Sequence, residues 1–143
     1  MLLKEIMTPN PQCVGPEDSL QDAARKMRDL DVGPMLVCDH DRLAGVLTDR
    51  DIVVAAVAEG KDPRTTHVRE AMSAGVICGF EDQDVEEAAR TMREKQIRRL
   101  PILNHEKRLV GIVSLGDLAT EMGDRRESGE TLREISEPSA PRR

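Results

Sequence analysis

Aromatic side chains are almost absent from this sequence, which has no Trp, no Tyr and one Phe among its 143 residues. Many proteins bind single-stranded nucleic acids by stacking the bases on aromatic rings, so this binding mode is nearly excluded. The formal net charge of −6 also opposes binding to a polyanion. We therefore expect no nucleic-acid partner, whereas a small anionic ligand needs only a local cluster of positive charge.

Long apolar runs are also lacking. No stretch has the continuous apolar length of a membrane span, and the first residues do not have the charged start and long apolar segment of a signal peptide. We therefore expect a cytoplasmic protein without a membrane association. The three cysteines, Cys13, Cys38 and Cys78, show no C-x-x-C spacing. They are expected to be buried, reduced thiols, and Cys13 can pair with Cys38 only if their strands lie close.

Catalytic patterns are missing as well. The sequence has no Gly-rich phosphate loop, no evident pairing of a nucleophile with a base, and no His residues at metal-ligand spacing to carboxylates. His40 and His105 fall in polar turns and are expected to be solvated, and His67 has no catalytic partner beside it in the sequence. We therefore predict that the chain is not an enzyme and holds no metal.

The chain contains an internal duplication. Shifted by 65 positions, residues 7–40 match residues 72–105 at eight positions, where roughly two matches are expected at average composition. One inserted residue then moves the offset to 66, which aligns Gly45 with Gly111 and Asp51 with Asp117. A tandem repeat of this kind means that both halves have the same order of secondary structure.

Each copy reads as β-α-β-β-α, so the predicted fold class is α+β. The first copy has a short strand, a helix with apolar residues at helical spacing, a hairpin and a final helix that starts near Asp49 and stops at Gly60. The expected segments are strands 12–14, 35–38 and 43–47 with a helix from 20 to 30, and strands 76–78, 100–103 and 109–113 with a helix beginning at 85. Because 38% of the residues are hydrophobic and almost none of them is aromatic, the core must be aliphatic.

These patterns divide the chain into four parts. We predict a first repeat at 1–60, a polar linker at 61–69, a second repeat at 70–123 and a mobile polar tail at 124–143.

A stretch running from glycine to aspartate joins the hairpin of each copy to its final helix. Gly45-Val46-Leu47-Thr48-Asp49-Arg50-Asp51 and Gly111-Ile112-Val113-Ser114-Leu115-Gly116-Asp117 both place a hydroxyl residue after an apolar strand and an aspartate three positions later. The simplest interpretation is a helix cap, because hydroxyl-x-x-Asp satisfies a loose capping box. The same arrangement can bind a ligand, because a helix start offers free N–H groups to a phosphate while a carboxylate accepts from sugar hydroxyls.

The sequence resembles the cystathionine-β-synthase (CBS) domain, which normally occurs as a tandem pair called a Bateman module. The resemblance covers about residues 3–122 and rests on the duplicated element order and on five segments: Ile6-Met7-Thr8, Val32-Gly33-Pro34-Met35-Leu36-Val37, Ile97-Arg98-Arg99-Leu100-Pro101-Ile102 and the two glycine-to-aspartate stretches. It implies two β-α-β-β-α repeats packed about a pseudo-twofold axis, two clefts that bind adenosyl ligands (AMP, ADP, ATP or S-adenosylmethionine), and a homodimer.

The resemblance also implies which residues form the main cleft. Thr48 would contact the phosphate, with Arg50 beside it, and Asp51 would contact the ribose hydroxyls. The second copy would add main-chain groups near Gly75 and Ile77, the side chain of Ile97 against the base, and Arg98 and Arg99 near the phosphates. Two guanidinium groups can offset a phosphate's charge. The competing interpretation is that Arg98 and Arg99 are a solvated pair before a strand.

The second cleft implied by the resemblance is expected to be weaker. It would use Ser114 and Asp117 with Asn10, Gln12 and Val32. The positions that match Arg98 and Arg99 are Gly33 and Pro34, and Gly116 stands opposite Arg50. The positive charge is therefore missing, and a nucleotide monophosphate should bind less tightly there.

These features predict a non-enzymatic regulatory module that binds an adenosyl ligand and signals to an unidentified effector protein. An alternative is a structural or interaction protein that keeps the fold without using its clefts. A nucleotide hydrolase is a distant third hypothesis.

Overall fold

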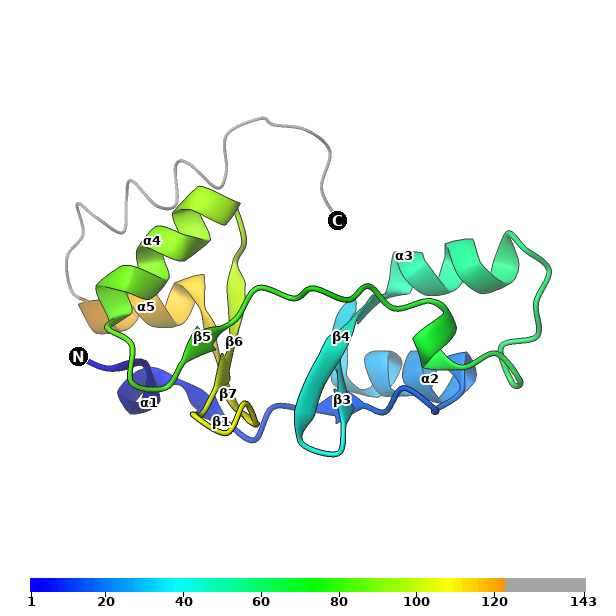
Figure 1. The fold of residues 1–143 in the computed structure, drawn as a ribbon. Coiled ribbons are helices and arrows are strands. Elements are labelled where there is room, and N and C mark those ends of the chain that lie inside the picture. Colours follow the sequence, from blue (N-terminus) through cyan, green and yellow to red (C-terminus); the bar gives the residue numbers. More distant parts are fainter. Residues whose placement is uncertain (123–143) are drawn as a thin grey trace. The chain divides into compact units, whose positions relative to one another are not determined.

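The computed structural model describes residues 1–122, so the predicted tail at 124–143 lies outside the described residues. The described residues form two compact units, one made of residues 1–11 and 77–122, the other of Gln12–Val76. The elements, drawn in Figure 1, are α1 Leu3–Ile6, β1 Thr8–Pro9, β2 Cys13–Val14, α2 Leu20–Leu30, β3 Pro34–Asp39, β4 Arg42–Thr48, α3 Asp49–Ile52, η1 Val53–Val57, η2 Val68–Glu70, β5 Gly79–Phe80, α4 Val85–Lys95, β6 Arg99–Leu103, β7 Leu109–Ser114 and α5 Leu115–Met122. The predicted α+β class is confirmed.

The unit Gln12–Val76 contains a three-stranded sheet in the order β2-β3-β4. Strands β3 and β4 form the expected antiparallel hairpin, and β2 pairs with β3 in parallel. Ser19 caps the helix α2, and its hydroxyl accepts from the Asp22 amide at 3.0 Å. Its buried side chains join those of the sheet in one aliphatic cluster: Val14, Leu20, Ala23, Met27, Met35, Val37, Leu47, Ala56 and Val68.

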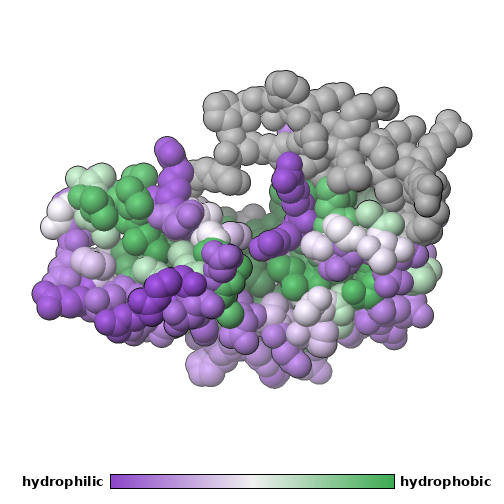
Figure 2. Space-filling model, turned by 180° about the vertical axis from the view of Figure 1, so that it is seen from behind, coloured by the Kyte–Doolittle hydropathy of each residue, from purple (hydrophilic) through white to green (hydrophobic). Residues whose placement is uncertain are grey.

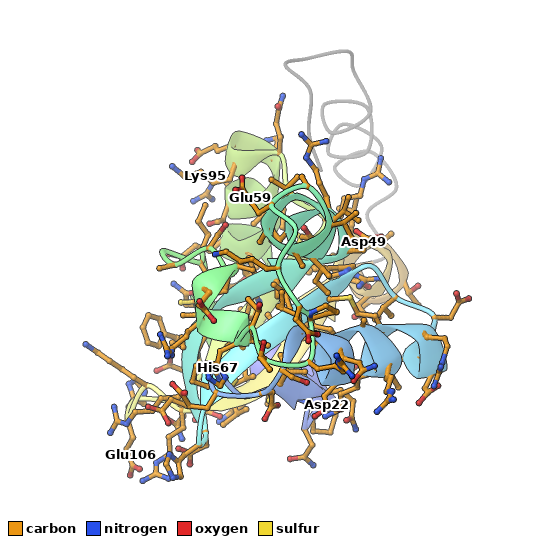
Figure 3. All side chains as sticks on the ribbon, turned by 90° about the vertical axis from the view of Figure 1, so that its right-hand side faces the viewer. Asp22, Asp49, Glu59, His67, Lys95 and Glu106 are labelled. Carbon is orange, nitrogen blue, oxygen red and sulfur yellow. The ribbon has the colours of Figure 1, made fainter. Side chains whose placement is uncertain are left out.

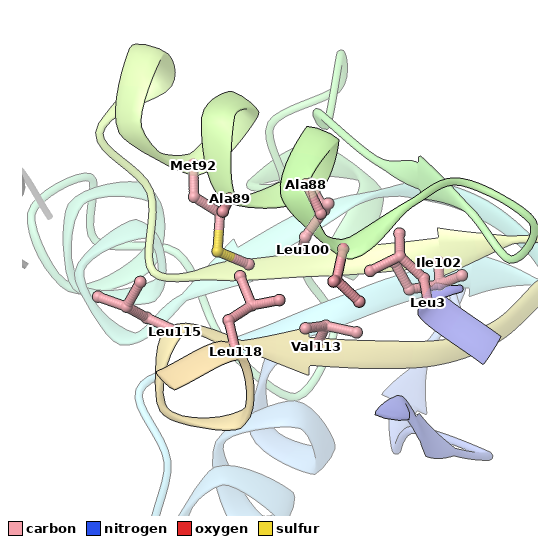
Figure 4. Close-up of a cluster of buried hydrophobic side chains, with 10 residues drawn as sticks. Leu3, Ala88, Ala89, Met92, Leu100, Ile102, Val113, Leu115 and Leu118 are labelled. Carbon is pink, nitrogen blue, oxygen red and sulfur yellow. The ribbon is translucent and has the colours of Figure 1, made fainter. Parts of the chain in front are cut away.

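The second unit contains a four-stranded sheet in the order β1-β7-β6-β5. Its core is again aliphatic, as the composition predicts, and is drawn in Figure 4 with side chains from α1, α4, β6, β7 and α5. The cluster comprises Leu3, Val85, Ala88, Ala89, Met92, Leu100, Ile102, Val113, Leu115 and Leu118. In the described part of the chain, no helix has both the length and the apolar character needed to cross a membrane.

The helix that follows β4 is less regular than expected. It begins at Asp49 and changes at Val53 from α-helix to the wider π-helix, which ends at Val57. Gly60 then closes it, with a left-handed φ of +68° and an N–H that donates to the Val57 carbonyl at 3.3 Å. A glycine at this position fits the usual C-terminal cap, so the predicted end of the helix is confirmed.

The predicted strand at 76–78 is wrong. Strand β5 is Gly79–Phe80, which pairs in parallel with Ile102 and Leu103 of β6. Gly75 has a φ of +75° and turns the backbone before the strand. Gly79 lies opposite Ile102 at the start of the pairing, and a Cβ on this glycine would lie 3.0 Å from Leu100 Cδ2. Cys78, which aligns with Cys13 of β2, therefore precedes the strand.

The compact units do not coincide with the sequence repeats, because the leading segments are exchanged. The N-terminal residues Thr8 and Pro9 pair with Ile112 and Gly111 of the second repeat. In return, Ser73, which opens the second repeat, forms a bridge with Val46 of the first. The end of the predicted linker takes part in this packing, since Thr66 and Val68 are buried in the unit Gln12–Val76.

Two aligned glycines make this exchange possible. A Cβ on Gly45 would lie 2.5 Å from the Ser73 carbonyl oxygen, and a Cβ on Gly111 would collide with the side chain of Met7. Both leading segments therefore lie directly on a glycine of the hairpin they pack against. Contact this close requires a residue without a side chain.

We predict that Gly45→Ala lowers the free energy of unfolding by about 1–3 kcal/mol, because the obstacle is backbone that cannot rotate away. Gly111→Ala should cost less, since the obstacle is the flexible Met7 side chain, and Met7→Ala should reduce that cost in the double variant. Urea unfolding measures all three. Gly116→Ala is the control, because the nearest atom to its Cβ is Ser114 Oγ at 3.7 Å. An unchanged stability for Gly45→Ala would contradict this packing.

Candidate ligand-binding residues

Thr48 ends strand β4 and caps the helix that follows. Its backbone is extended, with φ −110° and ψ 162°, and its hydroxyl oxygen accepts from the Asp51 amide at 3.1 Å. In return, the Thr48 amide donates to Asp51 Oδ2 at 2.9 Å. The capping interpretation of this stretch is therefore confirmed.

Ser114 and Asp117 repeat the same arrangement in the other unit. The Asp117 amide donates to Ser114 Oγ at 3.1 Å, and the Ser114 amide donates to Asp117 Oδ2 at 2.9 Å. The two helix starts thus have the same geometry although Thr replaces Ser. In both, the hydroxyl residue and the aspartate are half-buried.

Capping does not exhaust the chemistry of these groups. A hydroxyl that accepts from an amide keeps its own hydrogen as a donor, and a carboxylate has about four acceptor positions, of which the cap uses one. The first amides of a helix add donors and the positive end of the helix dipole. Each helix start can therefore offer donors to a phosphate and a carboxylate to sugar hydroxyls.

Arg98 and Arg99 lie beside Ser114 within their own unit. Arg99 is the partner of Ser114 across β6 and β7, and the Leu115 amide donates to the Arg98 carbonyl at 2.8 Å. Both side chains are exposed. Strand β6 thus brings the two arginines to the end of the sheet where the Ser114 helix start lies.

Gly33 and Pro34 occupy the equivalent place beside Thr48. Pro34 is the partner of Thr48 across β3 and β4, and the Asp49 amide donates to the Gly33 carbonyl at 3.1 Å. The carboxylate of Asp49, labelled in Figure 3, would be 3.3 Å from a Cβ on Gly33. Asp49 adds negative charge to this helix start, whereas its counterpart is the buried Leu115. No role was predicted for Asp49, although the alignment at an offset of 66 residues pairs it with Leu115 and shows the difference in charge.

The remaining predicted residues are divided between the two units. The unit Gln12–Val76 contains Gln12, Val32, Thr48, Arg50, Asp51 and Gly75. The other unit contains Asn10, Ile77, Ile97, Arg98, Arg99, Ser114 and Asp117. Both predicted sets therefore draw on both units and remain predictions. Within its unit, Ile97 packs against the core cluster, whereas Ile77 is 38% exposed.

Two of the predicted residues have left-handed backbones. Gly75 has a φ of +75° with nothing within 4 Å of its Cβ position, and Asn10 has a φ of +52°. Both residue types adopt this conformation readily. Both positions are exposed, so their main-chain groups lie at the surface.

The histidines lie on surface turns or at a helix start. His40 Nδ1 is 3.0 Å from an Asp39 oxygen, and His105 Nε2 is 2.8 Å from an Asp82 oxygen. His67, labelled in Figure 3, precedes η2. Its Nδ1 lies 3.0 Å from the Glu17 carbonyl oxygen. Among residues 1–122, no three His, Cys, Asp or Glu side chains gather as a metal site would require.

Known proteins resemble this chain over most of its length. The sequence model described as CBS domain matches residues 3–58 and 68–124. The CBS domain-containing protein YhcV of Bacillus subtilis (strain 168) is 40% identical over 134 residues, which is 94% of each chain.

Solved structures share the fold. The crystal structure of Hypoxic Response Protein I with two coordinated zinc ions is 38% identical, has a TM-score of 0.73, and matches 85% of this chain and 98% of its own. The crystal structure of CBSX2 in complex with AMP is 25% identical, has a TM-score of 0.71, and matches 87% of this chain and 98% of its own.

We predict that Thr48→Ala and Ser114→Ala each lower the free energy of unfolding by about 1 kcal/mol, because each removes the acceptor for a helix amide. Thr48→Ser keeps the oxygen and should lose much less. Chemical denaturation of the three variants measures the effect. If Thr48→Ala and Ser114→Ala both unfold like the wild type, the caps do not stabilise the fold.

Proposed function

The chain belongs to the CBS domain family, and we propose that it is a non-catalytic regulatory module that binds an adenine nucleotide. The observation that carries this proposal is the pair of matching helix starts, each with a hydroxyl and a carboxylate fixed by two hydrogen bonds. Fixed groups lose little freedom when a ligand binds, which favours affinity. The AMP complex of CBSX2, a protein of the same fold, supports the choice of ligand class.

In this proposal, Thr48 and Asp51 form the main binding element. The Thr48 hydroxyl and the helix amides hold a phosphate, Asp51 accepts from the ribose hydroxyls, and Arg50 lies in the same turn. Arg98 and Arg99 supply the charge that offsets the phosphate, Gly75 and Ile77 contact the base through their main chains, and Ile97 packs on it. The exposed position of both arginines leaves their guanidinium groups available to an anion.

Ser114 and Asp117, with Asn10, Gln12 and Val32, form the weaker element of the proposal. Its residues that match Arg98 and Arg99 are Gly33 and Pro34, which carry no charge. A less anionic adenosyl ligand such as S-adenosylmethionine suits it better than a nucleotide monophosphate.

Regulation then requires a coupling between ligand and conformation. A ligand shifts a protein toward the arrangement that it binds more tightly. We propose that the nucleotide selects one arrangement of the chain and that an effector protein recognises it. The three free thiols accord with a reducing compartment such as the cytoplasm.

A second candidate is a structural or interaction protein that does not bind nucleotides. It is favoured by one observation, namely that each aspartate already accepts from a backbone amide in its cap. Under this hypothesis, both glycine-to-aspartate stretches exist only to start their helices.

We further propose that the chain forms a homodimer through the helical turn η1. Val53, Val54 and Val57 are 54%, 50% and 74% exposed, whereas Ala56 of the same turn is buried. Figure 2 shows the resulting hydrophobic surface over α3 and η1, at the left of the view. Grouped, exposed apolar side chains commonly mark a protein interface.

Calorimetric titration with AMP, ATP and S-adenosylmethionine tests ligand binding directly. We expect Asp51→Ala to weaken AMP binding at least tenfold, because it removes the ribose acceptor, and Asp117→Ala to weaken it much less. Arg98→Ala should behave like Asp51→Ala. Both aspartates cap a helix, so Asp51→Ala and Asp117→Ala lose the same capping hydrogen bond. A difference between them in AMP affinity is therefore not caused by the loss of capping.

Three results would change the proposal. If the wild type binds none of these compounds at millimolar concentration, the structural alternative holds. Equal effects of Asp51→Ala and Asp117→Ala would contradict the ranking of the two elements. If Asp117→Ala and Arg98→Ala alone weaken binding, the arginines serve the helix start of their own unit.

The dimer proposal predicts that Val57→Glu shifts the protein to a monomer, because a buried carboxylate at the interface is costly. Sedimentation equilibrium measures the mass. Ala24→Glu, which adds the same charge at an exposed position of α2, should leave the dimer intact. A monomeric wild type would refute the interface.

A further inference from the structure

Met7 and Met72 occupy the same position in the two repeats. Met7 directly precedes strand β1, and Met72 directly precedes Ser73, which forms the bridge with Val46. Both methionines therefore stand in the leading segments that the two repeats exchange. Each one contacts a hairpin of its own compact unit.

The sulfur of each methionine lies against the glycine of that hairpin. A Cβ on Gly45 would be 3.3 Å from Met72 Sδ, and a Cβ on Gly111 would collide with Met7 Sδ. Both methionines also pack against the apolar core cluster of their unit. An atom added to either sulfur therefore has little free space on the side of the glycine.

These two methionines are more accessible than the methionines of the core. Met7 and Met72 are half-buried, whereas Met27, Met35 and Met92 are 6%, 3% and 0% exposed. A small oxidant can therefore reach Met7 and Met72 in the folded chain before it reaches the three core methionines.

We propose that Met7 and Met72 are reversible oxidation sites whose sulfoxides release the leading segments. The oxidant is a peroxide. The thioether sulfur attacks one peroxide oxygen, so that an S–O bond forms, the O–O bond breaks and one water leaves. The sulfur loses two electrons, which reduce the peroxide. A methionine sulfoxide reductase returns the thioether with two electrons and two protons taken from thiols, and a second water leaves.

The added oxygen destabilises the contact in two ways. Oxidation turns an apolar side chain into a polar one, and a polar group placed against an apolar cluster costs free energy. The oxygen also enlarges the side chain where it already touches the glycine, which adds packing strain. Both effects weaken the attachment of a leading segment to its hairpin.

Short backbone pairings hold the leading segments in place. Ser73 and Val46 exchange two backbone hydrogen bonds, each at 2.9 Å. In the other unit, β1 spans two residues, and Pro9 has no N–H to donate to β7. Release of the segments uncovers the edges of β4 and β7, and exposed strand edges can pair with other chains. The proposal does not depend on nucleotide binding.

The test treats the full chain with hydrogen peroxide and then with dithiothreitol. The second step reverses disulfides and sulfenic acids on the free thiols, of which Cys13 and Cys78 are half-buried, and leaves sulfoxides in place. We expect peptide mapping to find one added oxygen on Met7 and one on Met72, with the three core methionines unmodified. The melting temperature should fall by roughly 4 °C or more, and methionine sulfoxide reductases should restore it.

Hydrogen exchange shows whether a leading segment has left its hairpin. The Val46 amide donates to the Ser73 carbonyl, so its exchange should become about tenfold faster after oxidation. The Leu20 amide, which donates to the Thr66 carbonyl at 2.9 Å, lies outside both leading segments and is the control. Its exchange should change much less.

Leucine variants separate the chemistry of the sulfur from its packing. Met7→Leu and Met72→Leu keep an apolar side chain of similar volume, so the double variant should keep its melting temperature after peroxide treatment. Met1→Leu is the matched control, because Met1 is 55% exposed and belongs to neither core cluster. It should lose as many degrees as the wild type.

Three results would overturn the proposal. The first is oxidation of Met1 with Met7 and Met72 unmodified. The second is a sulfoxide on both Met7 and Met72 without a change in melting temperature or in exchange at Val46. The third is a double leucine variant that is as sensitive to peroxide as the wild type. Mapping and exchange use the wild type, so they test the proposal even if the double variant folds poorly.

Discussion

The reciprocal hydrogen bonds at the end of each hairpin connect the fold with the proposed function. At both places a hydroxyl oxygen accepts from the amide three residues later, and that residue's carboxylate accepts in return. The strand must end and the helix must start at one residue for both bonds to form. The same helix start carries a hydroxyl group and helix amides as donors, and carboxylate oxygens as acceptors. In the proposed function, the cap and the binding element are two uses of one arrangement, so ligand binding needs no new local structure.

Local patterns in the sequence were sufficient to predict much of the fold. The helical spacing around Met27 and Met92 and the polar turns at His40 and His105 identified two helices and two hairpins, because these features depend on residues close in the chain. The exchange of leading segments was not predicted. It depends on Met7 and Ser73 meeting glycines far away in the sequence, and one sequence alone does not give such pairings. The misplaced strand at 76–78 has a similar cause, since its start is decided by the partner strand β6.

For the candidate site too, the sequence predicted the local contacts and not the pairing of distant segments. The sequence predicted Thr48, Asp51, Ser114 and Asp117 as caps, and the structure confirms their contacts. Which arginines serve which helix start depends on the arrangement of two units, which no local pattern specifies. Within its unit, Arg99 lies opposite Ser114, whereas the family resemblance assigns it to Thr48. The difference matters for binding, because a phosphate is held most tightly at the helix start that lies beside the two guanidinium groups.

A crystal structure of the protein soaked with AMP shows directly whether Thr48 and Asp51 bind the nucleotide. We expect a nucleotide whose ribose hydroxyls donate to Asp51 and whose phosphate lies at Thr48 with Arg98 and Arg99 beside it, with lower occupancy at Ser114 and Asp117. A structure at saturating AMP with no nucleotide, or with nucleotide only at Ser114 and Asp117, would contradict it.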